Sequence, residues 1–324
     1  MKVTFWGARG SIPSPMTTVE LREKLKQALL GAVSVDLTDH HAVERYIEQL
    51  PQRISSTAGG NTTCVELRVG GNLFILDCGS GMRSLGNRLL QGTFGKGQGE
   101  AHIFISHTHW DHIQGFPFFI PAYVPGNKLI FHSPFPDLHN RLADQQREVY
   151  YPVSLEYMRS HLAFEVVDPN ETLNINGVEV KLILLSHPGG AYAYRFSYGG
   201  QVVVFASDGE YHRMDNESTT RYVEFFRDAD LLIFDAQYRF EQVIDERRDW
   251  GHSTPKMGAE LAFRARVKRL ALTHHDPVST DDVLWDAVAE AYNYLAFRSR
   301  GTGMNPQCEV ILAQEGTTVD LSGE

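Results

Sequence analysis

Short apolar runs recur along the chain and alternate with longer amphipathic segments. The runs are rich in Val, Ile, Leu and Phe and are bounded by Gly, Asn, Asp or Pro, a pattern that predicts β-strands. We expect strands at residues 3–6, 64–69, 73–77, 102–106, 128–132, 164–167, 178–185, 191–198, 201–206, 231–234, 269–273 and 309–313. The segments NINGVEV and SYGGQVVV each place a turn pair between strand-like flanks, which indicates two hairpins.

The amphipathic segments have the apolar spacing of helices. They cover residues 18–30, 39–50, 81–90, 137–148, 218–228, 253–266 and 280–297. The helix that begins at Ser253 has a capping residue at its start and Pro255 in its first turn, where a missing N–H costs little. Strands with helices interspersed predict an α/β protein of packed layers, with the helices outside the sheets.

Residues 16–55 interrupt this alternation with two helical patterns in succession. Such a segment is too short to bury a core of its own. We therefore interpret residues 1–324 as one domain that carries a helical insertion at 16–55. One interpretation of the insertion is functional, as a lid over a site or a contact between two copies of the chain. A helical pair that only packs on the outside is an equally good interpretation. A contact between copies would make the protein a homodimer.

The composition bounds the partners and the compartment. The chain has 324 residues, 42% hydrophobic and 22% charged, as in ordinary globular proteins. No apolar run approaches the ~18 residues of a membrane span, and no secretory signal is evident, so we expect no membrane association. Cys64, Cys78 and Cys308 cannot all pair within the chain, which favours reduced thiols and a cytoplasmic location. The net charge of −10 disfavours long nucleic acid as a partner but not a small phosphorylated molecule.

The stretch FISHTHWDHIQG places three histidines and an aspartate within six positions, from His107 to His112. His107 and His109 lie two apart just past a predicted strand, so both side chains can point the same way. Asp111 and His112 follow in a turn that starts a short helix. Neutral imidazole and carboxylate suit Zn, Mn and Fe alike. Four such groups are too many for one ion with an open position, so we expect two ions that share this loop.

Other side chains of ligand type directly follow predicted strands. They are His187 in LLSHPGG, Asp208 in FASDGEY and His274 in LALTHHDP, where His275 is a rival. Loops at one edge of a sheet are where a rigid scaffold gathers functional groups, so these side chains are expected to join the histidine loop. Asp77 in FILDCGSG is interpreted as orienting a ligand histidine or the loop.

The motif HTHWDH resembles the HxHxDH signature of the metallo-β-lactamase-fold hydrolases, and the later matches occur in the family's order. The resemblance implies a four-layer αββα sandwich with two divalent ions at one edge between the sheets, Zn²⁺ first and Mn or Fe as alternatives. It implies that the first ion is bound by His107, His109 and His187. It implies that the second is bound by Asp111, His112 and His274, with Asp208 bridging. A hydroxide between the ions is then the nucleophile.

Three further segments, LLIFDAQY, GHSTPKMGAELA and LALTHHDP, resemble the phosphodiesterase branch of this family, which includes ribonuclease Z and the cyclic ribose and cyclic nucleotide phosphodiesterases. In that branch a histidine of the GHST segment contacts the phosphate or protonates the leaving oxygen, and an acidic residue orients it. Here the pair is His252 and Asp235, which join Asp111 as the catalytic candidates. Asp208 stands where true β-lactamases usually carry Cys or Ser. We therefore expect a metal-dependent enzyme that hydrolyses a small or cyclic phosphodiester.

Candidate substrate contacts come from three other loops: Arg9 and Ser11 in WGARGSIP, Asn61 in GGNTTC, and Tyr211 and His212 in DGEYHRMD. For the first three, turn chemistry is an equally good interpretation. The apolar segment GFPFFIPAYVPG is interpreted as buried packing in preference to a pocket wall that stacks on a base.

Other functions stay open on the sequence. The same metals would serve a carboxyl-ester, thioester or lactone hydrolase, which needs no phosphate-binding histidine. A ribonuclease Z-like tRNA endonuclease is disfavoured because no glycine- and proline-rich arm is evident and the chain is acidic. A degraded scaffold would have lost ligands, and a diiron redox protein usually carries a flavin domain, which is not visible.

Overall fold

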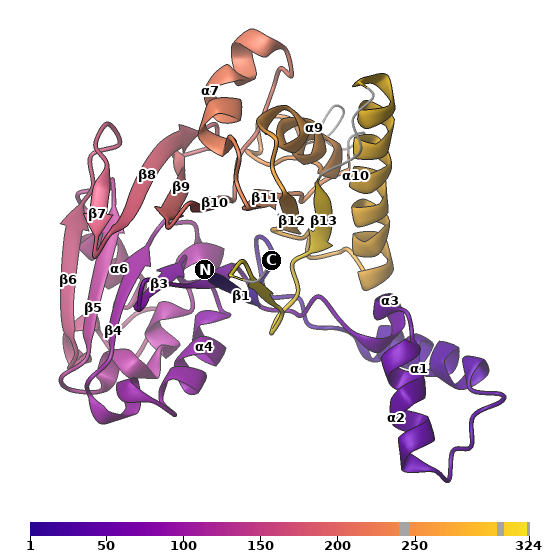
Figure 1. Cartoon of the computed structure of the whole chain (residues 1–324). Helices are drawn as coiled ribbons and strands as arrows, with labels where there is room; N and C mark the ends of the chain where they lie inside the picture. Colours follow the sequence, from indigo (N-terminus) through magenta and orange to yellow (C-terminus); the bar gives the residue numbers. More distant parts are fainter. Residues whose placement is uncertain (240–246, 303–307, 323–324) are drawn as a thin grey trace.

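Two β-sheets form the centre of the structure, a computed structural model that describes residues 1–239, 247–302 and 308–322 (Figure 1). Within these ranges each sheet has seven strands. The first sheet has the order β14 (Thr318–Asp320), β1 (Lys2–Gly7), β2 (Cys64–Val69), β3 (Asn72–Leu76), β4 (Glu100–Phe104), β5 (Lys128–Ser133) and β6 (His161–Val166). The second has the order β13 (Glu309–Leu312), β12 (Arg269–Thr273), β11 (Leu231–Asp235), β10 (Gln201–Ala206), β9 (Ala191–Tyr198), β8 (Val178–Leu185) and β7 (Leu173–Ile175).

Both sheets change from antiparallel to parallel pairing at a middle strand. In the first sheet the pairs from β14 to β3 are antiparallel and those from β3 to β6 are parallel. In the second the pairs from β7 to β10 are antiparallel and those from β10 to β13 are parallel. It follows that β1, β3 and β4 share one direction, as do β8, β10, β11 and β12. The loops after these strands leave at one edge of each sheet.

Apolar side chains divide into three large clusters that define four layers. One cluster lies between the sheets and joins residues such as Phe74 and Phe104 to Phe196 and Phe205. A second packs the outer face of the first sheet against α4 (Met82–Leu89) and α6 (Leu138–Gln145). The third packs the outer face of the second sheet against α7 (Asn216–Phe226), α9 (Pro255–Ala265) and α10 (Asp281–Thr302). The four-layer αββα sandwich expected from the sequence is confirmed.

Five predicted strands have the observed bounds, namely β2, β8, β9, β10 and β12. The strands β7 and β14 were not predicted, because three residues carry no readable alternation. The turn pair of NINGVEV still joins β7 to β8, with Asn176 and Gly177 both at positive φ, as the hairpin signal predicts. One detail differs: the cap of α9 is Thr254, which accepts from the Met257 N–H, and not Ser253.

Residues 16–55 form a helical arm that projects from the sandwich (Figure 1). It contains α1 (Thr18–Gly31), α2 (His40–Gln49) and α3 (Gln52–Ser55), and Thr17 and Glu20 form a capping box at the start of α1. No side chain of these three helices is buried. The root of the arm is fixed to α10 by Lys24, whose Nζ lies 2.9 Å from Asp281 Oδ2.

Two further observations concern the chain as a whole. Cys64, Cys78 and Cys308 are buried and free, as predicted. Over the part of the chain that the structure describes, no helix combines the length and the apolar character needed to cross a bilayer.

Candidate metal centre

Seven side chains with nitrogen or oxygen ligand atoms converge where the loops of the two sheets meet. The loop after β4 and the one-turn helix α5 (Trp110–Ile113) carry His107, His109, Asp111 and His112. The second sheet supplies His187 after β8, Asp208 after β10 and His274 after β12. All seven were candidate ligands from the sequence, and the structure brings all seven together.

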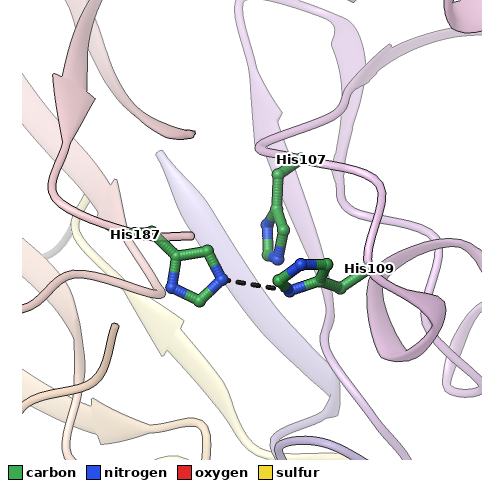
Figure 2. Close-up of side chains that lie close together, drawn as sticks. All are labelled: His107, His109 and His187. Carbon is green, nitrogen blue, oxygen red and sulfur yellow. Dashed lines mark hydrogen bonds between the residues drawn. The ribbon is translucent and has the colours of Figure 1, made fainter. Parts of the chain in front are cut away.

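The first group of ligand atoms belongs to His107, His109 and His187. Figure 2 shows the three rings turned toward one another, with the 3.0 Å contact between His187 Nε2 and His109 Nδ1 drawn as a dashed line. The ligand atoms of the three residues lie within 4.8 Å of one another. His107 Nε2 is buried and has no hydrogen-bond partner among the described residues. A buried ring nitrogen without a partner is costly unless something else binds it.

The second group is a compact triangle of Asp111, His112 and His274. His112 Nε2 lies 3.2 Å from His274 Nε2 and 3.3 Å from Asp111 Oδ2, and His274 Nε2 lies 3.0 Å from the same oxygen. A tetrahedral ion with bonds of about 2.1 Å separates its ligands by about 3.4 Å. The triangle therefore fits a divalent cation. His275 points elsewhere: its Nε2 donates to the Ala313 carbonyl at 2.9 Å.

Asp208 lies between the two groups. Its Oδ1 is 3.2 Å from His112 Nε2, and its Oδ2 is 3.7 Å from His107 Nε2 and 3.4 Å from His274 Nε2. One carboxylate thus faces both sets of ring nitrogens. This is the position expected of a bridging ligand.

Several residues of the site have a strained backbone conformation. Asp77, Asp208 and His274 have φ values of 59°, 59° and 58°, in the left-handed region. A non-glycine residue in this region is strained, and the strained conformation persists where the surrounding structure enforces it, often at functional sites. Ser11, with φ of 62°, is also here, and its N–H donates to Asp111 Oδ2 at 2.7 Å.

Hydrogen bonds behind the rings fix which nitrogen faces the cluster. The Nδ1–H of His112 donates to Asp77 Oδ2 at 2.7 Å. The Nδ1–H of His187 donates to the Gly251 carbonyl at 2.9 Å, and that of His274 to Gln237 Oε1 at 3.1 Å. In each case the Nε2 lone pair is left for a cation. Asp77 therefore lies where the sequence interpretation placed it.

Charge and burial act in opposite directions on the histidines. Burial lowers the pKa of His107 well below its usual value and also lowers that of His187, so both rings are neutral near pH 7. Burial disfavours the charged form of His274 too, but the negative charges of Asp208, Asp235 and Asp111 outweigh it and raise its pKa to about 9. Without a metal ion, His274 is therefore protonated near pH 7, and its positive charge offsets part of the negative charge of these carboxylates.

His252 and Asp235 form a pair beside the cluster. His252 Nδ1–H donates to Asp235 Oδ2 at 2.8 Å, and the ring stacks on His274 with centroids 4.9 Å apart. Asp235 is buried at the end of β11, and its Oδ1 accepts from the Gln237 N–H at 3.0 Å. The side chains suggested by the GHST and FDAQ segments are therefore in contact.

A pocket of ≈ 390 Å³ opens over the centre. Its lining residues are Ser11, Thr108, His109, Trp110, Asp111, Asp208, His252 and His274. Most of the lining consists of candidate ligands and His252. Of the five candidate substrate contacts, Ser11 alone is among these lining residues.

The other four candidate substrate contacts have partners or positions of their own. The Arg9 guanidinium donates to the carbonyls of Gly59, Asp276 and Ser279, and the Asn61 side chain bonds Glu315 and Ser80. These bonds favour the interpretation as loop structure. Tyr211 is buried against Phe234 and Tyr222, and His212 is exposed beside Glu210.

Three residues with evident roles were not among the sequence candidates. Gln237 joins His274 to Ser11, since its Nε2 donates to Ser11 Oγ at 3.1 Å. Glu210 is buried and accepts the N–H groups of Asp249 and Gly251, which holds the loop beside His187. Trp110 lines the pocket. The signal for Gln237 was available, because it follows Asp235 by two positions at the same strand end.

The fold and this cluster define a metal-dependent hydrolase of the metallo-β-lactamase type. The chain belongs to the β-lactamase superfamily: residues 72–275 match the family model described as "Beta-lactamase superfamily domain". The resemblance inferred from the sequence is confirmed, and so is the prediction of a metal-dependent enzyme. Divalent ions are the metals implied by this family and by the donor set.

Curated relatives and solved structures are consistent with the phosphodiesterase branch. Ribonuclease Z of Halorubrum lacusprofundi is 27% identical over 252 residues, 63% of this chain and 77% of that protein. Ribonuclease Z of a Picosynechococcus species is 26% identical over 289 residues, 72% and 87% of the two chains. The metallo-β-lactamase fold protein YhfI of Bacillus subtilis aligns with a TM-score of 0.63 at 18% identity over 98% of both chains. The short form of human tRNase Z aligns with a TM-score of 0.59 at 20% identity over 100% of both, a likeness of fold.

Proposed function

We propose that this protein hydrolyses a small or cyclic phosphodiester at a centre of two divalent ions, with Zn²⁺ as the first candidate. The observation that carries the proposal is the 2.8 Å hydrogen bond between His252 and Asp235 beside the ligand cluster. A phosphodiester with an alkoxide leaving group needs a proton donor, whereas an activated carboxyl ester does not. A positioned acid contributes roughly 10²- to 10⁴-fold to such a reaction.

The residues divide into two ligand sets and one acid. His107, His109 and His187 would hold one ion, Asp111, His112 and His274 the other, and Asp208 would contact both. Bound divalent ions activate water and withdraw charge from phosphoryl oxygens. A protonated His252 keeps its Nδ1–H on Asp235 and presents its Nε2–H to the leaving oxygen. After the transfer the ring is neutral, in the tautomer that Asp235 favours.

The size and charge of the protein favour a small substrate. The pocket of ≈ 390 Å³ has the volume of a site for one small molecule. The net charge of −10 repels a long polyanion, whereas the two divalent ions, once bound, would attract a single phosphate group.

Leaving-group dependence tests the role of His252. We expect His252→Ala to lower turnover of a cyclic nucleotide, which expels an alkoxide, by roughly 100-fold or more. Turnover of bis(p-nitrophenyl) phosphate should fall much less, because nitrophenolate leaves without a proton. Hydrolysis of p-nitrophenyl acetate, if the protein supports it, should be spared.

The matched control is His161→Ala, an exposed histidine on β6, which should leave all three rates unchanged. An equal loss on both phosphodiesters would show that His252 does not protonate the leaving group. A protein that holds two Zn²⁺ or Mn²⁺ ions but cleaves no member of a panel of cyclic and linear phosphodiesters would contradict the proposed function. Turnover of p-nitrophenyl acetate alone would favour a carboxyl-ester, thioester or lactone hydrolase.

A second candidate is cleavage of tRNA precursors, because the curated relatives above are named ribonuclease Z. Its test is a precursor tRNA with a 3′ extension, incubated with the metal-loaded protein at low and physiological salt. Efficient cleavage at physiological salt would favour this candidate over a small substrate, since an acidic chain binds a polyanion weakly there.

We also infer a cytoplasmic location for this activity. The support is the state of Cys64, Cys78 and Cys308, which are buried and free, as thiols are in a reducing compartment. Microscopy of a fluorescently tagged chain in the producing cell tests this location.

A further inference from the structure

Trp110 combines high exposure with a place in the pocket. Its side chain is 81% exposed, whereas the other residues of α5, Asp111, His112 and Ile113, are buried. The single turn of α5 thus directs three side chains inward and one indole outward. An indole presents a large apolar face and one polar N–H, and tryptophan is enriched at binding interfaces for this reason.

The position of Trp110 in the chain ties it to the metal centre. It stands between His109 and Asp111, so its Cα is ~3.8 Å from those of two candidate ligands. Its side chain lines the same pocket as His252 and Asp208. The Ser11 N–H donates to Asp111 Oδ2 at 2.7 Å, and Ser11 lines the same pocket as Trp110.

The nearby apolar segment 115–126 offers less surface for stacking. Phe116 and Phe119 are fully buried against the first sheet, as the sequence interpretation of buried packing predicts. Phe118 is 48% exposed but its ring packs edge-on against Tyr151. Among the residues that line the pocket, Trp110 is the aromatic side chain other than the histidines, and its exposed indole can receive a ring.

We propose that Trp110 is the platform on which the substrate stacks a planar ring, a nucleobase or a comparable aromatic group, while its phosphate lies at the metal centre. This inference rests on the proposed function and specifies its substrate class. Trp110 lines one pocket with the candidate ligands Asp111 and Asp208, so the ring of a substrate whose phosphate lies at those ligands would share the pocket with the indole. Stacking on an aromatic side chain tolerates different bases, because every base has a π-face.

Binding of two phosphates that differ in the ring tests the platform. The Zn²⁺-loaded protein is titrated by calorimetry with adenosine 5′-monophosphate and with ribose 5-phosphate. We expect Trp110→Ala to weaken binding of the nucleotide about tenfold and to leave ribose 5-phosphate unchanged. Trp110→Phe keeps a ring and should retain most of the nucleotide affinity. With a cyclic nucleotide as substrate, the alanine variant should raise KM more than it lowers kcat.

The control is Phe297→Ala, which removes a 72% exposed aromatic side chain from the outer surface of α10. It should leave both affinities unchanged, and the zinc content of each variant should equal that of the parent. An equal effect of Trp110→Ala on the two phosphates, or no effect on either, would overturn the stacking role alone. Failure of the parent protein to bind either phosphate would contradict the proposed function as well.

Discussion

Asp77 accepts a hydrogen bond from His112 Nδ1–H at 2.7 Å, and the same carboxylate accepts from the N–H and Oγ–H of Ser106 at 2.7 and 2.6 Å. The carboxylate is fully buried at the end of β3. When His112 is neutral, this bond fixes the tautomer whose Nε2 lone pair faces Asp111 and Asp208. One residue of the first sheet thus sets the ligand state of a histidine on the neighbouring loop.

Asp77→Asn should therefore weaken metal binding roughly 10- to 100-fold. The amide nitrogen can donate to His112 Nδ1, which favours the tautomer with a proton on Nε2, the atom that faces the cluster. Competition with a chromogenic chelator measures the affinity.

The matched control for this variant is Asp228→Asn. Asp228 has the same left-handed backbone, with φ of 53° against 59° for Asp77, but its carboxylate forms an exposed pair with Arg266. It should bind metal as the parent does. Equal affinities for all three proteins would show that Asp77 does not orient a ligand.

Metal binding should release protons. The pKa of His274 is about 9 without a metal ion, and the charges of Asp208, Asp111 and Asp77 raise that of His112 against the effect of burial. His274 is then protonated near pH 7.5, the raised pKa of His112 favours its charged form as well, and each ring must lose its Nε2 proton to bind a cation. We expect the affinity for Zn²⁺ to rise between pH 6.5 and 8.5. Calorimetry in buffers of different ionisation enthalpy counts the protons, and an enthalpy independent of the buffer would contradict this expectation.

A histidine pair remote from the ligand cluster should make stability fall in acid. His102 Nδ1 and His132 Nε2 lie 2.9 Å apart in the core, and burial lowers the pKa of His132 to about 3. The unfolded chain takes up a proton as the pH falls below about 6.5, whereas folded His132 does so near pH 3. Its contribution is therefore complete above pH 6.5 and is lost as the pH falls through this window, by roughly 2 kcal/mol between pH 6.5 and 5.

Thermal unfolding of the parent and His132→Gln, with a chelator present, isolates this contribution. The variant should be less stable at pH 7.5, and the difference in the free energy of unfolding should shrink toward pH 5. A difference that stays constant with pH would show that His132 does not bind its proton as proposed.

The helical arm should be removable without loss of the metal centre. Its two ends meet, since the Ser14 N–H donates to the Gly60 carbonyl at 2.8 Å. Replacing residues 17–55 by a short Gly-Ser linker should leave the zinc content unchanged. The replacement should lower the melting temperature, because it removes the ion pair between Lys24 and Asp281. Loss of zinc would show that the arm completes the site.

The arm-deleted protein also separates the interpretations of the arm: a contact between copies, a lid, or a helical pair packed on the outside that is neither. Sedimentation before and after the deletion reports whether the arm joins two copies. The KM for a cyclic nucleotide reports whether it covers the pocket.

The positions of the ligands were predictable because each follows a buried strand in sequence. His187, Asp208 and His274 each come after an apolar run, and the parallel or like-directed strands bring these ends to one edge. The pairing of His252 with Asp235 came from the resemblance and not from periodicity. Their contact depends on the path of the chain between β11 and α9.

Other features had no local signal. Trp110 occupies a variable position of HxHxDH, and the motif makes no prediction about the residues between the ligands. Its exposure follows from the single turn of α5, which the fold of the loop determines. Arg9 shows the reverse case: an arginine near a metal centre suggests an anion contact, yet three carbonyls take up its guanidinium.

The ligands come from both sheets, with four on the loop after β4 and three on the second sheet. A bound ion consequently links the two sheets at the edge where these loops leave. Its complete ligand set exists only while the two sheets are packed together. At a free metal concentration 100 times the Kd of the site, one such ion adds about 2.7 kcal/mol to the free energy needed to separate the two sheets. Chelation should then loosen this edge before the opposite end, and hydrogen exchange would be fastest in the strands that end there.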